Sequence, residues 1–228
     1  MEKDAGRKAC LSRYAGLAVD AVLAGVALGI ACTANVAVRP TALGALLFSV
    51  GMFTIASCDM ALFTGKLCFL LEKTGPGLAE LLLCWLGNLL GVSAVGYALR
   101  LTRLAPVIAA RAAVFCEERL CDKAVSIFLL GVFCNFLICM GVQNYKHKSD
   151  VLGRYVGLFL SVTVFVSCGY EQSIADMYYF SLANLWGAGA LRVVLLASLG
   201  NLAGGLLMPA AAGWKEKISK SSSGLPSL

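Results

Sequence analysis

The chain of 228 residues is 59% hydrophobic and only 14% charged, with a mean hydropathy of +0.81 and a net charge of +6. Soluble domains are typically about 45–50% apolar and about 25% charged. This composition therefore excludes a soluble globular domain and a disordered chain. The length accommodates about six membrane spans of roughly 20 residues with short connections. We predict one all-α, polytopic transmembrane domain over residues 1–228.

Six apolar segments follow one another along the chain. They cover residues 14–36, 41–63, 77–99, 124–144, 151–187 (interrupted) and 190–212. The flanking segments are a basic N-terminus, 1–13, and a serine-rich tail, 215–228, which we predict to be disordered. Eleven Lys and Arg residues fall on the side of the termini and seven on the other side. This bias predicts that both termini are cytoplasmic.

The connections and the cysteines give two further expectations. The run from Leu104 to Cys116 in the third connection is apolar enough to lie at the membrane interface. Of the ten cysteines, eight lie in or beside apolar segments, where we expect them to pack as small hydrophobic residues. Cys116 and Cys121 lie in the polar third connection and are the pair that could form a disulfide.

An internal repeat relates the two halves of the chain. The string GNLLG at Gly87–Gly91 returns as GNLAG at Gly200–Gly204, 113 positions later. The same offset places the polar interruption 57–66 on the interruption 170–179. A repeat of three spans inverts on duplication, and inverted repeats with broken helices are common in solute pathways. We predict an inverted three-helix repeat with spans two and five broken, as in an aquaporin-like protomer.

Charged residues inside apolar segments mark functional sites by default. The candidates are Asp20, Asp59, Glu80, Glu171, Asp176 and Arg192. Those in the interruptions, Asp59, Glu171 and Asp176, are expected to line or brace a pathway. The others can also lie at the ends of spans or face water. The buried amides Asn88 and Asn201 need partners, which the neighbouring broken spans would supply.

The sequence contains no set of residues that predicts an enzyme. The single histidine, His147, lies in a polar Lys-His-Lys connection, and a second histidine for a metal pair is missing. A P-loop is also absent, so ATP-driven transport is not expected. We therefore predict neither a catalytic activity nor a cofactor or metal. The basic residues lie between and beyond the spans, which indicates contact with lipid and not with nucleic acid.

From about Tyr14 to Trp214 the chain resembles the formate/nitrite transporters, pentameric channels for small monovalent anions and their conjugate acids. The matching strings are Leu62–Gly65 (LFTG), Gly87–Gly91, Gly131–Cys139 (GVFCNFLIC), Phe165–Met177 (FVSCGYEQSIADM) and Gly200–Gly205 (GNLAGG). The resemblance implies a homopentamer in the cell (cytoplasmic, or inner) membrane, with a separate pore in each protomer.

The resemblance also implies which residues form the pore. The residues expected to contact the permeant are Thr64, Gln172, Asn201, Glu171 and Asn88. Hydrophobic constrictions are expected on the two sides of a central vestibule, formed on one side by Phe48, Met52 and Leu62 and on the other by Phe165. The cations expected to attract anions at the pore mouths are Arg154 and Lys66.

The chain departs from the family pattern near both breaks. Gln172 stands where the family usually has histidine. Ala61 replaces an acidic residue, Asp176 replaces an asparagine, and Lys66 replaces an uncharged residue. Glutamine cannot exchange a proton near neutral pH, but its amide can donate a hydrogen bond to a carboxylate or nitrite oxygen. We therefore hypothesise that Gln172 and Thr64 orient the permeant and that water supplies the proton.

The permeant is expected to be formate, with nitrite or hydrosulfide as alternatives, because the shared pore residues recognise size and charge. A bare anion in a dry apolar constriction costs tens of kcal/mol by a Born argument. A neutral acid costs far less, so permeation should be proton-linked. An aquaporin-like pore for neutral solutes would need the Asn-Pro-Ala boxes that the sequence lacks. A membrane scaffold or sensor would not need polar residues in both breaks.

Overall fold

The computed structural model of the protein describes residues 2–72 and 75–222. Over these two ranges the chain forms nine helices and no strand, which confirms the predicted all-helical class. The helices are α1 (Glu2–Ala37), α2 (Thr41–Ser57), α3 (Phe63–Leu67), α4 (Leu78–Arg100), α5 (Ala105–Cys121), α6 (Ala124–His147), α7 (Val151–Ser167), α8 (Ser173–Ala183) and α9 (Ala188–Ser222).

Four of these helices are long and apolar enough to cross a membrane. The spanning parts are Cys10–Ala37 in α1, Leu78–Arg100 in α4, Ala124–His147 in α6 and Ala188–Ala211 in α9. The shorter apolar helices α2 and α7 are each followed by a break and then by a second short helix, α3 or α8. The pairs α2–α3 and α7–α8 thus correspond to the two spans that were predicted to be broken.

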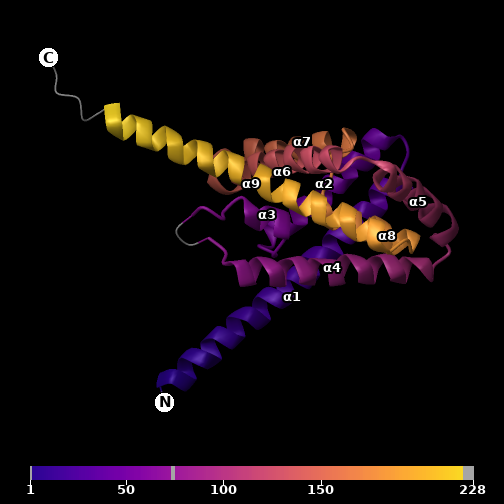
Figure 1. Ribbon diagram of the computed structural model, residues 1–228, viewed down its shortest axis with the longest axis horizontal. Coiled ribbons are helices and arrows are strands. Elements are labelled where there is room, and N and C mark those ends of the chain that lie inside the picture. Colours follow the sequence, from indigo (N-terminus) through magenta and orange to yellow (C-terminus); the bar gives the residue numbers. More distant parts are fainter. Residues whose placement is uncertain (1, 73–74, 223–228) are drawn as a thin grey trace.

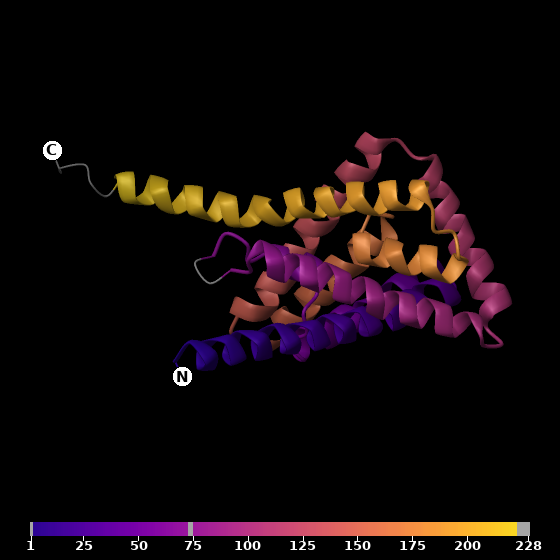
Figure 2. The same ribbon diagram turned by 60° about the horizontal axis from the view of Figure 1, so that its bottom comes forward.

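The two ends of the chain lie at the same end of the helical bundle. The first turns of α1 and the last turns of α9 project beyond the other helices, and α5 lies at the opposite end (Figures 1 and 2). Helix α9 continues to Ser222, whereas the tail 215–228 was expected to be disordered, and residues 223–228 lie outside the described part. From Glu2 onward, the N-terminal segment 1–13 is likewise the beginning of α1.

The same backbone motif ends α2 and α7 at the two breaks. The residues Asp59, with φ 50°, and Gly169, with φ 67°, adopt a left-handed conformation. The next backbone N–H, of Met60 or Tyr170, donates back to a carbonyl of the preceding helix at 3.0 Å in each case. This is the hydrogen bond of a Schellman-type helix stop. Asp59 therefore ends α2, and its side chain is exposed.

The helix contacts repeat between the two halves. Helix α1 packs mainly on α4, and α6 packs mainly on α9. The halves meet where α2 contacts α7, where α8 lies on α4 and where α3 lies on α9. Each short helix that follows a break therefore contacts the long helix of the other half. The opposite orientation of the halves in the bilayer stays a prediction.

The glycines of the repeated motif lie where long helices cross closely. A Cβ added to Gly91 would collide with the backbone carbonyl of Val22, and one added to Gly204 would collide with the carbonyl of Val132. Small residues allow such close approach between membrane helices. These glycines therefore allow the long helices to pack closely.

We expect Gly204→Ala to destabilise the protein by about 1–3 kcal/mol, because the methyl group meets backbone that cannot rotate away. Gly16→Ala is the matched control, since no described atom lies within 4 Å of its added Cβ. Thermal unfolding in detergent, followed by tryptophan fluorescence, measures the difference. Equal midpoints for the two variants would contradict the prediction.

A disulfide joins the first break to the second half of the chain. Cys68, directly after α3, is bonded to Cys139 of α6, with the two Cα atoms 5.2 Å apart. The expectation that both act only as small hydrophobic residues is therefore wrong. Cys116 and Cys121, the pair that could have formed a disulfide, are both free, with Cys116 buried and Cys121 exposed.

Candidate functional site

Asn88 of α4 braces the first break from a fully buried position. Its Oδ1 accepts a hydrogen bond from the N–H of Phe63 at 2.8 Å. Its Nδ2 donates to the carbonyls of Ala61 at 2.9 Å and Ala21 at 2.7 Å. One amide thus pairs three backbone groups, two of them left open where the helix is broken, as membrane burial requires.

Asn201 of α9 braces the second break in the same way. Its Oδ1 accepts from the N–H of Ser173 at 3.0 Å, and its Nδ2 donates to the carbonyls of Glu171 at 2.8 Å and Gly131 at 2.9 Å. The prediction that both amides bind the broken spans is confirmed. The offset of 113 positions between the two halves holds for Asn88 and Asn201. At the breaks the offset is 110 positions, because Ser173 takes the place of Phe63, so the predicted offset of 113 is wrong there.

Two cavities approach the breaks from opposite ends of the bundle. The Lys66 cavity has a volume of about 410 Å³, and the Gln172 cavity has a volume of about 330 Å³. Arg13 borders the first and Asn35 borders the second, and these residues lie toward opposite ends of α1. A pathway through the protomer would therefore pass between the two cavities.

Apolar side chains line the inner part of each cavity. Met52 and Leu62 border the Lys66 cavity, whereas Phe48 and Phe165 border the Gln172 cavity. The rings of Phe48 and Phe165 meet edge to face, with centroids 5.8 Å apart. Phe48 therefore lies with Phe165, and the expected grouping of Phe48 with Met52 and Leu62 is wrong. Phe48 and Met52 lie one turn apart on α2, and they border different cavities.

Thr64 and Gln172 meet between the two cavities. The Nε2 of Gln172 donates to the Oγ1 of Thr64 at 3.3 Å, and both residues are buried. The Oε1 of Gln172 accepts from the N–H of Ala175 at 2.6 Å and so caps the start of α8. This arrangement leaves the Thr64 hydroxyl hydrogen and one Gln172 amide hydrogen available to an acceptor.

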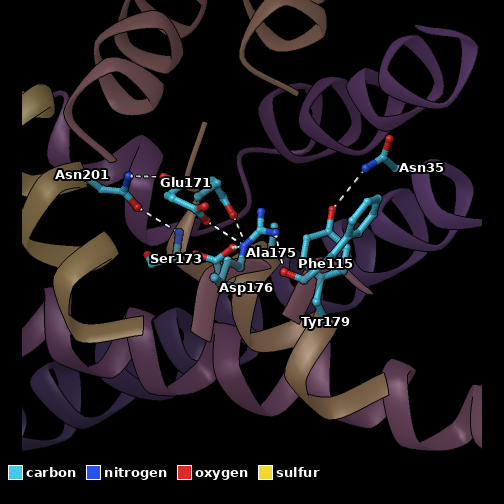
Figure 3. A network of polar contacts seen from close by, with 10 residues as sticks. Asn35, Phe115, Glu171, Ser173, Ala175, Asp176, Tyr179 and Asn201 are labelled. Atoms are coloured by element: carbon cyan, nitrogen blue, oxygen red, sulfur yellow. Dashed lines mark hydrogen bonds and ion pairs between the residues drawn. The ribbon is translucent and has the colours of Figure 1, made fainter. Parts of the chain in front are cut away.

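A buried ionic cluster lies beside Gln172 and is drawn in Figure 3. The Nε of Arg119 in α5 donates to Glu171 Oε2 at 2.8 Å and to Asp176 Oδ1 at 2.9 Å. Both carboxyl groups border the Gln172 cavity, as does Arg119. The expectation that Glu171 and Asp176 line or brace a pathway stays a prediction. We call these three residues the Arg119 cluster.

Aromatic and amide groups extend the Arg119 cluster. The guanidinium of Arg119 lies 5.3 Å from the ring centroid of Tyr179, whose hydroxyl accepts from the Nδ2 of Asn35 at 3.2 Å (Figure 3). Phe115 packs edge to face on Tyr179 and accepts a hydrogen bond from Arg119 through its carbonyl. Helix α5 therefore packs on α8, and the expected position of its apolar run at the membrane interface stays a prediction.

Sequence reasoning missed Arg119, Tyr179 and Asn35. A usable signal was present, because two carboxylates within one broken span require a cation. Arg119 follows an apolar stretch of the third connection and could have been chosen as that cation.

The two cations expected at the pore mouths, Lys66 and Arg154, differ in position. Lys66 borders the Lys66 cavity together with Asp59, whereas Arg154 does not border either cavity. The Nε of Arg154 donates to the carbonyl of Tyr145 at 2.6 Å, and the guanidinium lies over the Tyr145 ring. Of the two cations expected at the pore mouths, Lys66 borders a cavity and Arg154 does not.

The remaining charged candidates are Glu80, Asp20 and Arg192. Glu80 borders the Lys66 cavity and pairs with Arg13 at 2.5 Å, whereas Asp20 is exposed on α1. Arg192 donates to the backbone carbonyls of Leu120 and Asp122. Among the residues that the structure describes, no three His, Cys, Asp or Glu side chains are grouped to hold a metal ion.

Comparisons with known proteins agree with this architecture. A family model described as "Formate/nitrite transporter" matches residues 1–215. The chain is 25% identical over 196 residues to a probable formate transporter of Methanothermobacter thermautotrophicus, covering 73% of this chain and 72% of that protein. It is 27% identical over 173 residues to the nitrite transporter NirC of Escherichia coli (strain K12), covering 72% of this chain and 63% of that protein. The chain thus spans about two thirds of the length of these relatives.

A solved structure of a pentameric formate channel with formate bound has the same fold. It superposes with a TM-score of 0.76 at 22% identity and covers 91% of this chain and 98% of that chain. This likeness shows that the two chains share a fold.

Proposed function

The chain belongs to the formate/nitrite transporter family, a family of channels and transporters and not of enzymes, and we propose that it conducts formate together with its conjugate acid. The observation that supports this proposal is the hydrogen bond between Thr64 and Gln172, which lies between two cavities that reach the breaks from opposite ends. The free hydroxyl and amide hydrogens of this pair suit the two oxygens of a carboxylate or nitrite ion.

The apolar side chains on both sides of Thr64 and Gln172 favour the neutral acid in the narrow parts of the path. Phe48, Met52, Leu62 and Phe165 are each at most 2% exposed. Transfer of a bare anion past such groups is far more costly than transfer of a neutral acid of similar size. Lys66 can attract the anion into its cavity, and the donors of Thr64 and Gln172 can orient it. Proton-linked permeation does not require a histidine in this arrangement.

Nitrite is the second candidate substrate, and hydrosulfide is the third. A relative named as a nitrite transporter is 27% identical, a value close to the 25% of the relative named as a formate transporter. The donors at Thr64 and Gln172 fit nitrite as well as formate, whereas hydrosulfide offers a weaker acceptor. The proposed roles of Asn88, Asn201 and Glu171 in the pore are indirect, through the hydrogen bonds that shape the breaks.

The assembly that we propose is a homopentamer in the cell membrane with both termini cytoplasmic. The similar solved structure is a pentameric channel. The protomer also carries an apolar exterior, for example Leu82, Leu86 and Leu90 on one face of α4, which are 57%, 47% and 62% exposed. Such a face requires lipid or a neighbouring protomer. The excess of basic residues on the side of the termini supports the orientation.

Uptake into proteoliposomes tests the proposed function. Labelled formate is offered at external pH 5 and pH 7, with nitrite and hydrosulfide as competitors. We expect higher uptake at pH 5, because above the pKa of a weak acid its neutral fraction rises about tenfold for each unit by which the pH falls. A competitor that inhibits at far lower concentration than formate itself would move the assignment to that ion. Uptake of none of the three by folded, inserted protein would contradict the proposal.

A further inference from the structure

The Arg119 cluster contains two acids and one cation in a nearly dry site. The side chains of Arg119, Glu171 and Asp176 are 12%, 6% and 0% exposed. The guanidinium is always protonated in proteins. If both carboxyl groups were ionised, the cluster would therefore keep one uncompensated negative charge. A buried carboxyl group in this position takes up a proton instead.

The geometry of Asp176 gives a second, independent indication of a proton. Its Oδ2 has no hydrogen-bond partner among the described residues, although Asp176 is fully buried. A carboxylate oxygen without a donor is unfavourable there. A protonated carboxyl group can instead donate to a neighbouring carboxylate. One oxygen of each acid lies within 2.9 Å of the same Arg119 nitrogen, so the two groups can share one proton as close carboxyl pairs do.

The surrounding groups do not supply a second cation. Within the described residues, Arg119 is the one cation that borders the Gln172 cavity. The other ionisable groups at this cavity are Glu118, Asp122, Tyr170 and Tyr179. Three thiols lie within electrostatic range of Asp176, namely Cys32 on α1, Cys116 on α5 and Cys134 on α6. Arg192 of α9 is occupied by the carbonyls of Leu120 and Asp122.

We propose that Glu171 and Asp176 hold one proton between them, and that this acid pair is the titratable site that makes anion entry into the Gln172 cavity depend on pH. The second half of the proposal rests on the proposed function. With the proton bound, the Arg119 cluster is neutral. When the proton leaves, the Arg119 cluster adds a buried negative charge to the cavity wall, beside Glu118 and Asp122, and this charge repels an anion. The acid pair lies close to Gln172 in sequence and in space. It can bind and release a proton, which the amide of Gln172 cannot do.

Infrared spectroscopy of the purified protein in lipid nanodiscs tests whether the acid pair holds a proton, and it does not require a transport assay. At pH 7 exposed carboxyl groups are ionised, so a protonated carboxyl C=O band reports a buried acid. We expect this band in the unmodified protein. Asp176→Asn and Glu171→Gln should each remove it, because the remaining carboxylate pairs one to one with Arg119. Arg119→Leu should instead strengthen it, because both acids then become neutral.

The matched control is Glu117→Gln, which changes an exposed glutamate on the same helix as Arg119. It should leave the band unchanged. An unmodified protein without the band at pH 7, or a band that persists in both Asp176→Asn and Glu171→Gln, would overturn the proposal. Absence of the band from the unmodified protein overturns the proposal even where a variant fails to fold.

The pH profile of formate uptake tests the link to permeation. Loss of the neutral acid alone lowers uptake about tenfold per pH unit. The unmodified protein should fall more steeply at high pH, because the cavity wall also becomes negative. Asp176→Asn should follow the shallower slope, and Glu117→Gln should keep the steeper one. Equal slopes for the unmodified protein and Asp176→Asn would overturn this link. A complete absence of uptake would instead contradict the proposed function. The infrared band would still test whether Glu171 and Asp176 hold a proton.

Discussion

Replacement of Gln172 by leucine is expected to lower formate uptake by roughly 5- to 100-fold. The variant removes the amide donor beside Thr64 and leaves a permeant oxygen without a partner in a buried place. Such a loss is worth about 1–3 kcal/mol, and each 1.4 kcal/mol is about tenfold. Initial rates of uptake into proteoliposomes at pH 5 measure the effect. Unchanged uptake would remove Gln172 from the mechanism.

The control for this variant must account for the second role of Gln172, which caps α8 through Ala175. Asp150 caps α7 in the same way, with its Oδ2 accepting from the N–H of Gly153 at 2.8 Å. Asp150 is exposed and does not border the Gln172 cavity. Asp150→Leu therefore loses a cap and no pore contact. If both variants lowered uptake equally, the effect of Gln172→Leu would come from the cap.

The second large effect concerns folding, and we expect Asn201→Leu to destabilise the protein by more than about 3 kcal/mol. The substitution leaves the N–H of Ser173 and the carbonyl of Glu171 without a partner, and it also removes the second hydrogen bond of the Gly131 carbonyl within α6. Each unpaired buried group costs about 1–3 kcal/mol, against a total stability of about 5–15 kcal/mol for a typical protein. Asn88→Leu should behave alike, because Asn88 pairs three backbone groups at the first break.

Two other asparagines provide a graded control for these variants. Asn135 is fully buried but makes one hydrogen bond, from its Nδ2 to the carbonyl of Asn201 at 2.8 Å. Asn144 is only partly buried. We expect the loss of thermal stability in detergent to fall in the order Asn201→Leu, Asn135→Leu, Asn144→Leu. A similar loss in all three would show that the number of hydrogen bonds does not determine the effect.

Local features of the sequence were sufficient for much of this architecture. Long apolar segments predict spans because a bilayer leaves few alternatives for the backbone. The interruptions at Asp59 and Gly169 coincide with the ends of α2 and α7. The need of a buried amide for partners predicted that Asn88 and Asn201 would bind the broken spans, which the hydrogen bonds confirm.

Other features required the tertiary structure, because they depend on residues that are distant in sequence. The partner of Glu171 and Asp176 is Arg119, which lies 52 and 57 positions away on a helix expected to rest at the interface. Cys68 and Cys139, 71 positions apart, were not distinguishable from the other apolar cysteines. The grouping of Phe48 with Phe165 follows from the contact of α2 with α7.

The sequence by itself thus determined the class of the protein, its broken spans, their amide braces and a short set of pore candidates, because hydropathy and the cost of buried polar groups act locally along the chain. The tertiary structure alone decided which cation meets which acid, which aromatic rings meet and which side of the protein each cavity faces. Those pairings are set by the packing of one half of the chain on the other, and the spacing of residues within one segment carries no information about them.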